Sequence, residues 1–364
     1  MAPADAAQQR MVNQLLAGPS RAGPADVVRH LGAMQAQDYA QALWAIGARL
    51  ARLTVTDVTD AIADRVILRT WPLRGTIHFL PSADAAWMLE VSAARTIARR
   101  ATRLAELGLD ETTLQRCHRL LRAALADGPV TRPRIMELLE AAGIGTAGQR
   151  GYTVLWHAAQ SGLICFGPIA GKQQTFALLE DWVPSAMRTP VDQPAVELAR
   201  RYFTSHGPAT VHDFAWWAAI TVTAARSALA ALPEEFSSTS IDGTAHWSAV
   251  GPPPRAAPGP RLLAGFDEIL LGYQDRSAAL PTAYAPRIVP GGNGVFQPTM
   301  IRDGQVVGTW RRAVTAATSV TVDLFPFEDV APSVDAFCAE AERFADFLEV
   351  SLARVTVHDP GVGN

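Results

Sequence analysis

The sequence predicts an α+β protein, mainly helical, made of three tandem winged-helix units followed by a small antiparallel β-sheet. Two observations lead to this fold class. The order of three helices and a hairpin recurs along the chain, and the turns Asp127-Gly-Pro-Val-Thr131 and His206-Gly-Pro-Ala-Thr210 match each other between comparable helices. A proline- and glycine-rich stretch at 251–260 then interrupts the repeats. The expected units therefore cover residues 1–108, 109–192, 193–254 and 261–364.

The first unit is the loosest copy of the repeat. A short helix is expected over 10–22, and a second helix begins near Pro24, a residue suited to the first helical turn. Residues 43–50 fit either a helix or a buried strand. Thr56 can cap a helix that runs to Ala63. The hairpin of this unit is expected at 65–71 and 76–80.

The second and third units follow the same order more clearly. In the second unit, Thr131 can cap a helix that has Pro133 in its first turn. In the third unit, Asp242-Gly243 is a typical two-residue hairpin turn. The expected helices lie at 114–125, 131–139, 151–160, 195–203, 211–219 and 223–232, and the expected hairpins at 162–179 and 236–250.

The C-terminal unit has the pattern of a small antiparallel sheet closed by one helix. Short β-branched runs predict its strands, and Asp303-Gly304 predicts a turn. The helix expected over 332–352 carries an apolar face that can pack on the sheet. The expected strands are 287–289, 295–301, 305–311 and 318–324.

The composition is that of a water-soluble protein with a sizeable core, because 49% of the residues are hydrophobic and 18% are charged. No apolar run approaches the roughly 20 residues that a membrane span needs. The N-terminal stretch shows no basic start followed by an apolar segment, so we expect a cytoplasmic protein. Cys117, Cys165 and Cys338 are far apart, which fits free thiols and neither a zinc site nor a disulfide framework.

Arginine dominates the basic residues, and much of it is clustered. Lys172 is the single lysine among 32 basic residues, so the other 31 are arginines. The net charge of −3 argues on average against a nucleic-acid ligand, and high-GC codon usage would also enrich arginine. A basic middle segment with an acidic C-terminal group can nevertheless bind DNA. The clustered arginines are Arg95, Arg99, Arg100, Arg103, Arg116, Arg119, Arg122, Arg132 and Arg134.

Five stretches of the sequence form a specific combination: residues 31–38, 68–79, 206–217, 266–277, and 292–299 continuing to 308–310. Together they resemble the AlkZ-like DNA glycosylases, a bacterial winged-helix family, over nearly the whole chain. The active site of that family is a Gln–apolar–Gln or Gln–apolar–Asp motif, which here is Gln35-Ala36-Gln37. The resemblance implies the Gln–Gln branch, which is tied to resistance against DNA-alkylating and crosslinking natural products such as azinomycin.

The resemblance also implies a C-shaped arrangement around a basic concave face, with a β-hairpin that probes the duplex. We expect that hairpin at 287–298, and 302–309 is the rival position. The implied catalytic residues are Gln35 and Gln37, without a cofactor or a metal. The implied partner is double-stranded DNA with alkylated purines or interstrand crosslinks, bound by a nucleoid-associated monomer. Candidate DNA contacts are Arg69, Arg74, Arg276, Arg311, Arg312 and Asn293.

Two neutral amides can suffice for this chemistry. A purine alkylated at N7 is cationic and already a good leaving group, and the transition state is oxocarbenium-like at C1′. A glutamine carbonyl accepts from water and its amide donates, so two of them can hold a water in line. Asp38 is expected to be a surface or helix-capping residue rather than a further catalytic carboxylate. Lys172 stands alone in a loop, so no lysine Schiff-base lyase step is expected.

Two other hypotheses remain open from the sequence. The chain could be a non-enzymatic winged-helix DNA-binding regulator, or a glycosylase for small methylated purines. A regulator has no use for the glutamine pair, which favours an enzyme. Asp267 and Glu268 are expected to be structural acceptors rather than a catalytic carboxylate pair. The core is expected to contain Trp44, Trp71, Trp216 and Trp217.

Overall fold

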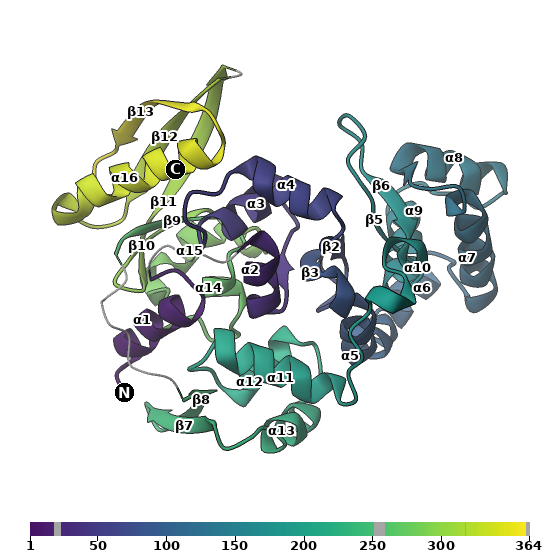
Figure 1. Ribbon diagram of the computed structural model, residues 1–364, viewed down its shortest axis with the longest axis horizontal. Helices are drawn as coiled ribbons and strands as arrows, with labels where there is room; N and C mark the ends of the chain where they lie inside the picture. The colour runs from purple at the N-terminus through teal and green to yellow at the C-terminus, as the bar shows by residue number, and fades with distance from the viewer. Residues whose placement is uncertain (18–22, 251–258, 317, 362–364) are drawn as a thin grey trace.

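The computed structural model describes residues 1–17, 23–250, 259–316 and 318–361. Helices and strands are mixed along the chain, and three groups of elements surround those of the first unit (Figure 1). Helices α6 to α9 (101–160) lie at one end, strands β11 to β13 with α16 (305–357) lie at another, and α11 to α13 (194–230) lie below the elements of the first unit. The mixed helix and strand content agrees with the expected α+β class.

The described part of the first unit up to Pro81 holds four helices and a three-stranded sheet of order β1-β3-β2. Helix α2 begins at Pro24 as expected, whereas α1 begins at Pro3, earlier than the expected start at residue 10. The ambiguous segment 43–50 is mostly helical, and the cap of α4 is Thr54 rather than Thr56. The elements are α1 (Pro3–Asn13), α2 (Pro24–Leu31), β1 (Met34–Gln35), α3 (Tyr39–Gly47), α4 (Val55–Ala63), β2 (Ile67–Thr70) and β3 (His78–Pro81). The expected end of the first helix, Gly18-Pro19, lies outside the described residues.

The second unit contains the expected helices and hairpin, preceded by two helices that the pattern did not predict. Those two are α5 (Ala85–Ala98) and α6 (Ala101–Glu106). Thr131 is the N-terminal cap residue of α8, and the sheet has the order β4-β6-β5. The remaining elements are α7 (Glu111–Leu125), β4 (Val130–Thr131), α8 (Arg132–Ala141), α9 (Arg150–Gln160), β5 (Ile164–Phe166), β6 (Thr175–Leu178) and α10 (Leu179–Trp182).

The third unit follows the expected order closely. Its hairpin turns at Asp242 and Gly243, which have φ of +48° and +78°, the left-handed values that such a turn requires. The Thr210 hydroxyl caps α12 by accepting from the backbone N–H of Asp213. The elements are α11 (Pro194–Ser205), α12 (Val211–Trp217), α13 (Val222–Ala230), β7 (Phe236–Ile241) and β8 (Thr244–Ala249).

The C-terminal sheet has five strands in the order β13-β12-β11-β10-β9, and its last strand corrects the expected topology. Strands β12 and β13 pair in parallel, so the sheet is mixed rather than purely antiparallel. Helix α16 ends at Phe347, before the expected end at 352, because 351–357 forms β13. The elements are β9 (Arg261–Leu263), α14 (Glu268–Leu271), α15 (Ala285–Ile288), β10 (Thr299–Arg302), β11 (Gln305–Ala316), β12 (Ser319–Pro326), α16 (Val334–Phe347) and β13 (Ser351–Val357). Short 3-10 helices cover Ser82–Asp84, Ser185–Met187, Thr282–Tyr284, Pro290–Gly292 and Ala331–Ser333.

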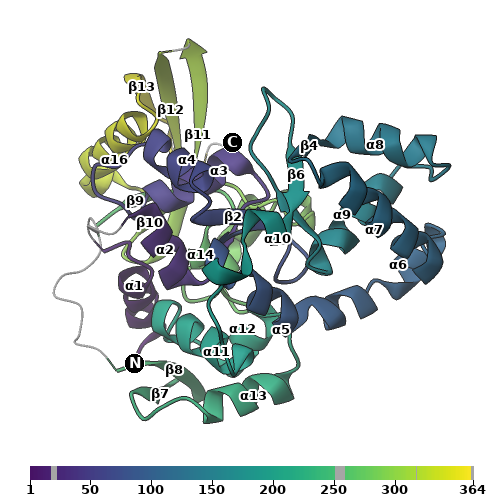
Figure 2. The ribbon, with the colours of Figure 1, turned by 45° about the vertical axis from the view of Figure 1, so that its right-hand side comes forward.

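Of the two expected positions of the DNA-probing hairpin, only the rival, 302–309, is a hairpin in the structure, where β10 pairs with β11. The segment 287–298 contains the end of α15, a 3-10 helix and a loop, and it forms no strand. The turn within 302–309 is packed on α1, where a Cβ on Gly304 would lie 2.7 Å from the Ala7 carbonyl carbon. The long hairpin of this region is β11–β12, which pairs from Gly308 with Pro326 to Ala316 with Ser319. Figure 2 shows it extending away from the helices of the first unit.

Two hydrophobic clusters form the core, and both cross the expected unit boundaries. One contains Trp44, Trp156 and Trp310, which belong to the first, second and C-terminal units. The other joins Leu68, Trp182 and Trp217 from the first, second and third units. Trp44, Trp71 and Trp217 are buried as expected, whereas Trp216 is half-buried. The boundaries at 108, 192 and 254 stay a prediction.

Two further observations concern the described part of the chain. Cys117 and Cys165 are buried and Cys338 is half-buried, all as free thiols. No group of three potential metal ligands occurs among the described residues. No helix of the described residues combines the length and apolar character needed to cross a membrane.

Candidate active site

The glutamine pair lies on a short segment that hydrogen-bonds to the neighbouring strand. Gln35 is the last residue of β1 and pairs with His78 of β3. The Ala36 N–H donates to the Ile77 carbonyl at 2.7 Å. The Ile77 N–H donates back to Gln37 Oε1 at 3.3 Å. Gln35 is half-buried and Gln37 is exposed, so the segment presents one amide at the surface and one just beneath it.

Arg69 holds the backbone between the two glutamines. Its Nε and Nη2 donate to the Ala36 carbonyl at 3.1 and 2.9 Å, and its guanidinium lies 4.5 Å from the Phe166 ring centroid. Arg69 is 5% exposed, and burial lowers its pKa to about 10, so it remains charged at neutral pH. A buried guanidinium that donates to a backbone carbonyl from two nitrogens is not placed to bind a phosphate. This position therefore corrects the expectation that Arg69 contacts the DNA backbone.

The half-buried Arg74 side chain hydrogen-bonds to the first glutamine of the motif. Its Nη2 donates to Gln35 Oε1 at 3.4 Å, and its Nη1 donates to the Trp217 carbonyl at 2.9 Å. The turn that carries it has φ of +54° at Arg74 and +69° at Gly75. A Cβ on Gly75 would lie 2.9 Å from Trp156 Nε1, so only glycine fits there. The structure thus gives Arg74 a positioning contact with the glutamine motif.

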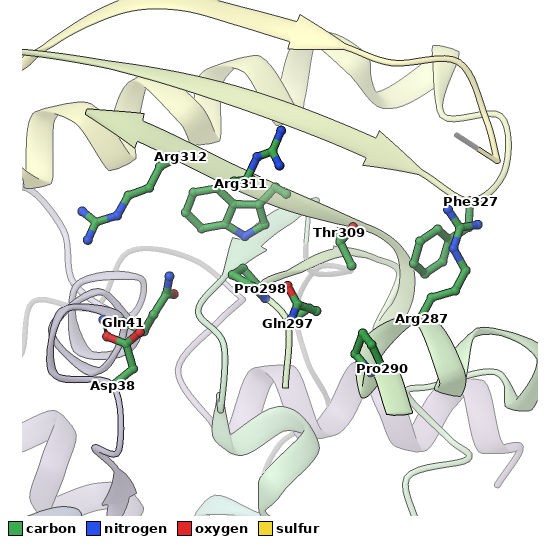
Figure 3. Close-up of a pocket in the computed structure, with 11 residues that line it drawn as sticks. Asp38, Gln41, Arg287, Pro290, Gln297, Pro298, Thr309, Arg311, Arg312 and Phe327 are labelled. Carbon is green, nitrogen blue, oxygen red and sulfur yellow. Dashed lines mark hydrogen bonds between the residues drawn. The ribbon is translucent and has the colours of Figure 1, made fainter. Parts of the chain in front are cut away.

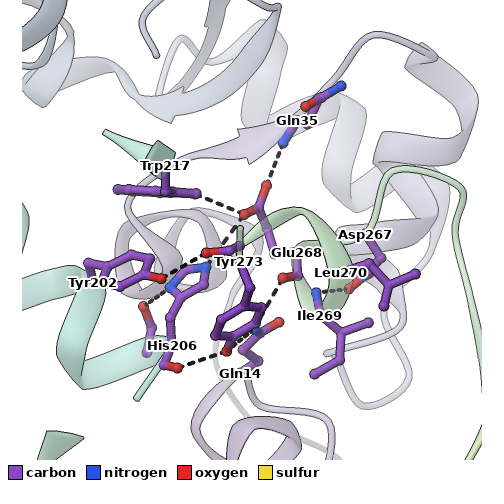
Figure 4. Close-up of polar contacts among 12 residues, drawn as sticks. Gln14, Gln35, Tyr202, His206, Trp217, Asp267, Glu268, Ile269, Leu270 and Tyr273 are labelled. Atoms are coloured by element: carbon purple, nitrogen blue, oxygen red, sulfur yellow. Dashed lines mark hydrogen bonds and ion pairs between the residues drawn. The ribbon is translucent and has the colours of Figure 1, made fainter. Parts of the chain in front are cut away.

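Glu268 lies directly beneath the glutamine segment and is the centre of a buried polar network (Figure 4). Its Oε1 accepts from the Gln35 N–H at 3.1 Å, and its Oε2 accepts from Trp217 Nε1 at 3.0 Å. His206 Nε2 lies 3.4 Å from the same Oε2. Glu268 is 1% exposed, so these groups replace the water that a carboxylate needs.

The network keeps one charge state over the neutral pH range. Burial alone would raise the pKa of Glu268, but the His206 hydrogen bond and the nearby Arg74 charge lower it to about 2. Burial and Arg74 lower the pKa of His78 to about 4, so His78 is neutral. His78 Nδ1 lies 2.9 Å from the Thr76 carbonyl, and its Nε2 faces Arg74 at 3.5 Å. At neutral pH, the site thus holds an ionised carboxylate and an ionised guanidinium behind two neutral amides.

Asp267 has a separate structural task, as the sequence suggested. It forms a two-point ion pair with Arg49, with both N···O distances at 2.8 Å and both side chains buried. Its Oδ1 also accepts from the Ile269 N–H and so caps α14. The adjacent carboxylates therefore face different partners, and Asp267 fixes the short helix on which Glu268 is carried.

An open cavity of ≈ 700 Å³ lies between the start of α3 and the C-terminal sheet (Figure 3). Asp38 and Gln41 line one side of it, next to the glutamine motif in sequence, and Asp38 caps α3 as expected. Arg311 and Arg312 of β11 line another side, together with Arg287. The segment 287–298 borders the cavity through Pro290, Gln297 and Pro298. Two of the expected DNA contacts, Arg311 and Arg312, thus border the same cavity as Asp38, which directly follows the glutamine motif in sequence.

The two remaining candidate contacts are held by local interactions. Arg276 is half-buried, its Nε donates to the Leu270 carbonyl at 2.8 Å, and its guanidinium lies 5.2 Å from the Trp216 ring centroid. Trp216 is also contacted by the guanidinium of Arg74, at 4.6 Å. Asn293 is exposed, and its Oδ1 accepts from the Val295 N–H at 2.9 Å. Asn293 lies on the loop rather than on a hairpin.

Comparison with known proteins identifies the class of enzyme to which this site belongs. A sequence model described as "DNA glycosylase AlkZ-like" matches residues 28–347, which makes the protein a DNA glycosylase. The chain belongs to the AlkZ-like DNA glycosylase family, as the motif combination predicted. A relative from Streptomyces sahachiroi, named "Interstrand DNA cross-link repair glycosylase", is 28% identical over 328 residues, covering 83% of this chain and 85% of that protein.

The solved structure of "Streptomyces sahachiroi DNA glycosylase AlkZ" has the same fold. It matches with a TM-score of 0.82 and covers 98% of this chain and 100% of that chain, at 23% sequence identity. The overall arrangement of the helices and the mixed sheet is therefore shared over essentially the whole molecule.

The sequence reasoning missed the residues that support the glutamines. Trp217 was expected in the core and Glu268 as a structural acceptor, and His78 and His206 had no expected part in the site. A signal was nevertheless present, because they fall in three of the motif stretches, 68–79, 206–217 and 266–277. The sequence could not predict that these residues lie together, because Glu268 contacts Gln35, which lies 233 positions earlier.

Proposed function

We propose that the protein is a monofunctional DNA glycosylase that hydrolyses the N-glycosidic bond of bulky N7-alkylated purines. We extend this to unhooking of the interstrand crosslinks that such purines form, with Gln35 and Gln37 as the catalytic pair. The observation that carries the proposal is the fixed Gln35-Ala36-Gln37 segment, in which two amides are presented over a buried carboxylate. Membership of the glycosylase family and the name of the crosslink-repair relative support it.

The chemistry needs little from the enzyme beyond position and charge. The C1′–N9 bond breaks, and its electron pair neutralises the cationic purine, which leaves with its alkyl group. A water oxygen then adds to C1′, and its proton passes to solvent, which leaves an abasic site. Amides are weak bases, so Gln37 orients this water by accepting and donating rather than by removing its proton.

The DNA surface in this proposal is the concave side of a C-shaped assembly of three winged-helix units. Arg311 and Arg312, which border the cavity beside Asp38, contact the backbone, and the hairpin β11–β12 probes the duplex. This position replaces the two hairpin positions expected from the sequence. Arg276 and Asn293 are retained as backbone contacts near the same opening. The enzyme acts as a monomer in this proposal, without a lysine imine.

The decisive experiment measures release of a bulky N7-alkylated purine from a defined duplex. Gln37→Ala should lower the single-turnover rate constant by about 100-fold, because the water is no longer oriented. Gln115→Ala is the matched control, since this glutamine is exposed on α7 and bonded to Glu111. The control should release base at the wild-type rate. Full activity in the Gln35→Ala/Gln37→Ala double variant would refute the role of the pair.

The same duplexes decide between the remaining hypotheses. Tight binding without base release by the wild type would make the chain a non-enzymatic DNA-binding regulator. Faster release of a methylated purine than of the bulky adduct, measured in competition, would assign it to small lesions. A crosslinked duplex that separates into single strands after incubation would support unhooking.

A further inference from the structure

The strongest unassigned feature of the molecule is the carboxylate of Glu268, which the exposed part of the site does not include. Three motif stretches contribute groups around it, namely Gln35, Arg74, and the pair His206 and Trp217, while a fourth stretch carries Glu268 itself. Trp217 links Glu268 to Arg74, because its indole N–H donates to Glu268 and its carbonyl accepts from Arg74. Arg74 in turn donates to Gln35 Oε1 of the motif.

We propose that Glu268 is a positioning residue for base excision, which fixes the backbone and amide of Gln35 and supplies a permanent negative charge behind them. This inference rests on the proposed hydrolysis of the glycosidic bond. A buried charge is costly to keep unless donors surround it, and here the Gln35 N–H and Trp217 Nε1 supply them. The carboxylate faces the first glutamine through the Gln35 N–H at 3.1 Å, so its charge lies directly behind the catalytic motif.

The polar atoms around Glu268 leave little freedom to an uncharged replacement. Oε2 faces the indole N–H of Trp217 and His206 Nε2, at 3.0 and 3.4 Å. Oε1 faces the Gln35 N–H at 3.1 Å. An amide NH₂ placed at either oxygen would point a donor at the Trp217 or Gln35 donor. Glu268→Gln therefore keeps the shape, removes the charge and strains the contact with either Gln35 or Trp217.

The charge that we assign is constant over the working pH range. The titratable or charged groups that face Glu268 are Arg74, His78, His206, Tyr202 and Tyr273. Burial lowers the pKa of both histidines and raises the pKa of both tyrosines. The pKa of Arg74 is lowered only to about 10. None of these groups changes charge from about pH 7 to about pH 8.5.

The test compares Glu268→Gln with Asp213→Asn by single-turnover base release. Asp213 is a matched control, because its carboxylate is 1% exposed and accepts from the backbone N–H of Gln274 and Asp275, and it does not contact the glutamine segment. We expect Glu268→Gln to lower the rate constant about 100-fold while the reaction amplitude and DNA affinity stay at wild-type values. Asp213→Asn should lower the melting temperature and the amplitude, with an unchanged rate constant.

Several outcomes would overturn the proposal. One is a wild-type rate constant in Glu268→Gln, or a loss confined to the amplitude, because a structural acceptor affects only the folded fraction. Another is a wild-type rate that falls with an apparent pKa between about 7 and 8.5, since the charge would then not be permanent. If Glu268→Gln does not fold, Trp217→Phe decides, because it removes one donor to Oε2 and keeps an aromatic ring. It should lower the rate constant about 10-fold, and an unchanged value refutes the proposal.

Failure of this inference is distinct from failure of the proposed function. If the wild type releases no base, the glycosylase proposal itself is wrong. If the wild type is active and Glu268→Gln is equally active, only the positioning role of Glu268 is wrong.

Discussion

Arg69→Met separates the two roles that can be given to Arg69. As a phosphate contact, this residue would contribute to DNA affinity and to its dependence on salt. As a clamp on the Ala36 carbonyl, it would act on the rate of base release and leave affinity unchanged. Methionine keeps an unbranched chain in the same buried space between Tyr39 and Phe166, but it removes the charge and both donors.

The stability of the Arg69→Met protein should change little, because two effects oppose each other. Losing two charge-assisted hydrogen bonds to one carbonyl costs about 1.5–3 kcal/mol. Burial lowers the pKa of Arg69 from 12.5 to about 10, which corresponds to a penalty of roughly 3 kcal/mol on its charged form. Methionine avoids that penalty. We therefore expect the free energy of unfolding to change by less than about 2 kcal/mol.

Base release should nevertheless fall by about 100-fold, because the backbone between Gln35 and Gln37 is no longer held. Three measurements decide: the single-turnover rate constant, the DNA dissociation constant at several salt concentrations, and urea denaturation. The clamp predicts a slower rate with an unchanged salt slope. An unchanged rate constant would refute the reasoning, and a loss of about 0.9 in the slope of log affinity against log salt would restore the phosphate contact.

Three other predictions follow from the same geometry. Burial and Arg74 lower the pKa of His78 from 6.5 to about 4 in the folded protein. The stability that neutral His78 contributes is therefore complete above about pH 6.5 and is lost as pH falls through about 4. The loss amounts to at most roughly 3 kcal/mol. Urea denaturation at about pH 7 and about pH 4.5 measures this loss, and His78→Asn should reduce it; equal stability at both values would contradict the prediction. Gly304→Ala should cost about 1–3 kcal/mol in thermal or chemical unfolding without changing DNA affinity, because its Cβ would press on α1. A loss of DNA affinity in this variant would return the turn at 302–309 to the DNA interface. Arg311→Ala and Arg312→Ala should each lower the salt slope of DNA binding by about 0.9, whereas Arg29→Ala, on the exposed side of α2 and paired with Asp26, should leave it unchanged.

Local sequence signals predicted the elements that local rules control. Pro24 begins α2, Thr131 begins α8, and Asp242-Gly243 turns the hairpin of the third unit. The segment near 287–298 misled the prediction because its apolar residues, Ile288, Val289 and Val295, have the composition of a strand. Pro286 and Pro290 lack the N–H that a ladder requires, and Gly291 takes φ of +69°, so the chain turns instead.

The last strand of the sheet was missed for a different reason. Residues 351–357 show an irregular burial pattern, exposed at four positions, and β13 is an edge strand in parallel with β12. An edge strand needs no strict alternation, so periodicity carries little information there. The pairing with β12 depends on α16 reversing the chain direction, which only the fold can supply.

The glutamine motif does not include the residues that hold it in place. The glutamine pair is recognisable from its resemblance, yet neither amide is held by its sequence neighbours. Its partners are Arg69, 33 positions from Ala36; Arg74, 39 positions from Gln35; and Glu268, 233 positions from Gln35. Each partner looked ordinary in the sequence, where arginine is common and Glu268 adjoins another carboxylate.

The network also explains why an amide pair needs so large a scaffold. A neutral amide has no charge of its own to offer a developing cation, so the charge must come from a group placed behind it. That group must be buried to be effective, and a buried carboxylate must be satisfied by several donors. Here the donors come from β1, from α12 and from the end of α11, while Arg74 adds a counter-charge from the β2–β3 turn. The motif stretches of this chain are therefore best understood as the parts of one electrostatic unit, of which Gln35 and Gln37 are the exposed end.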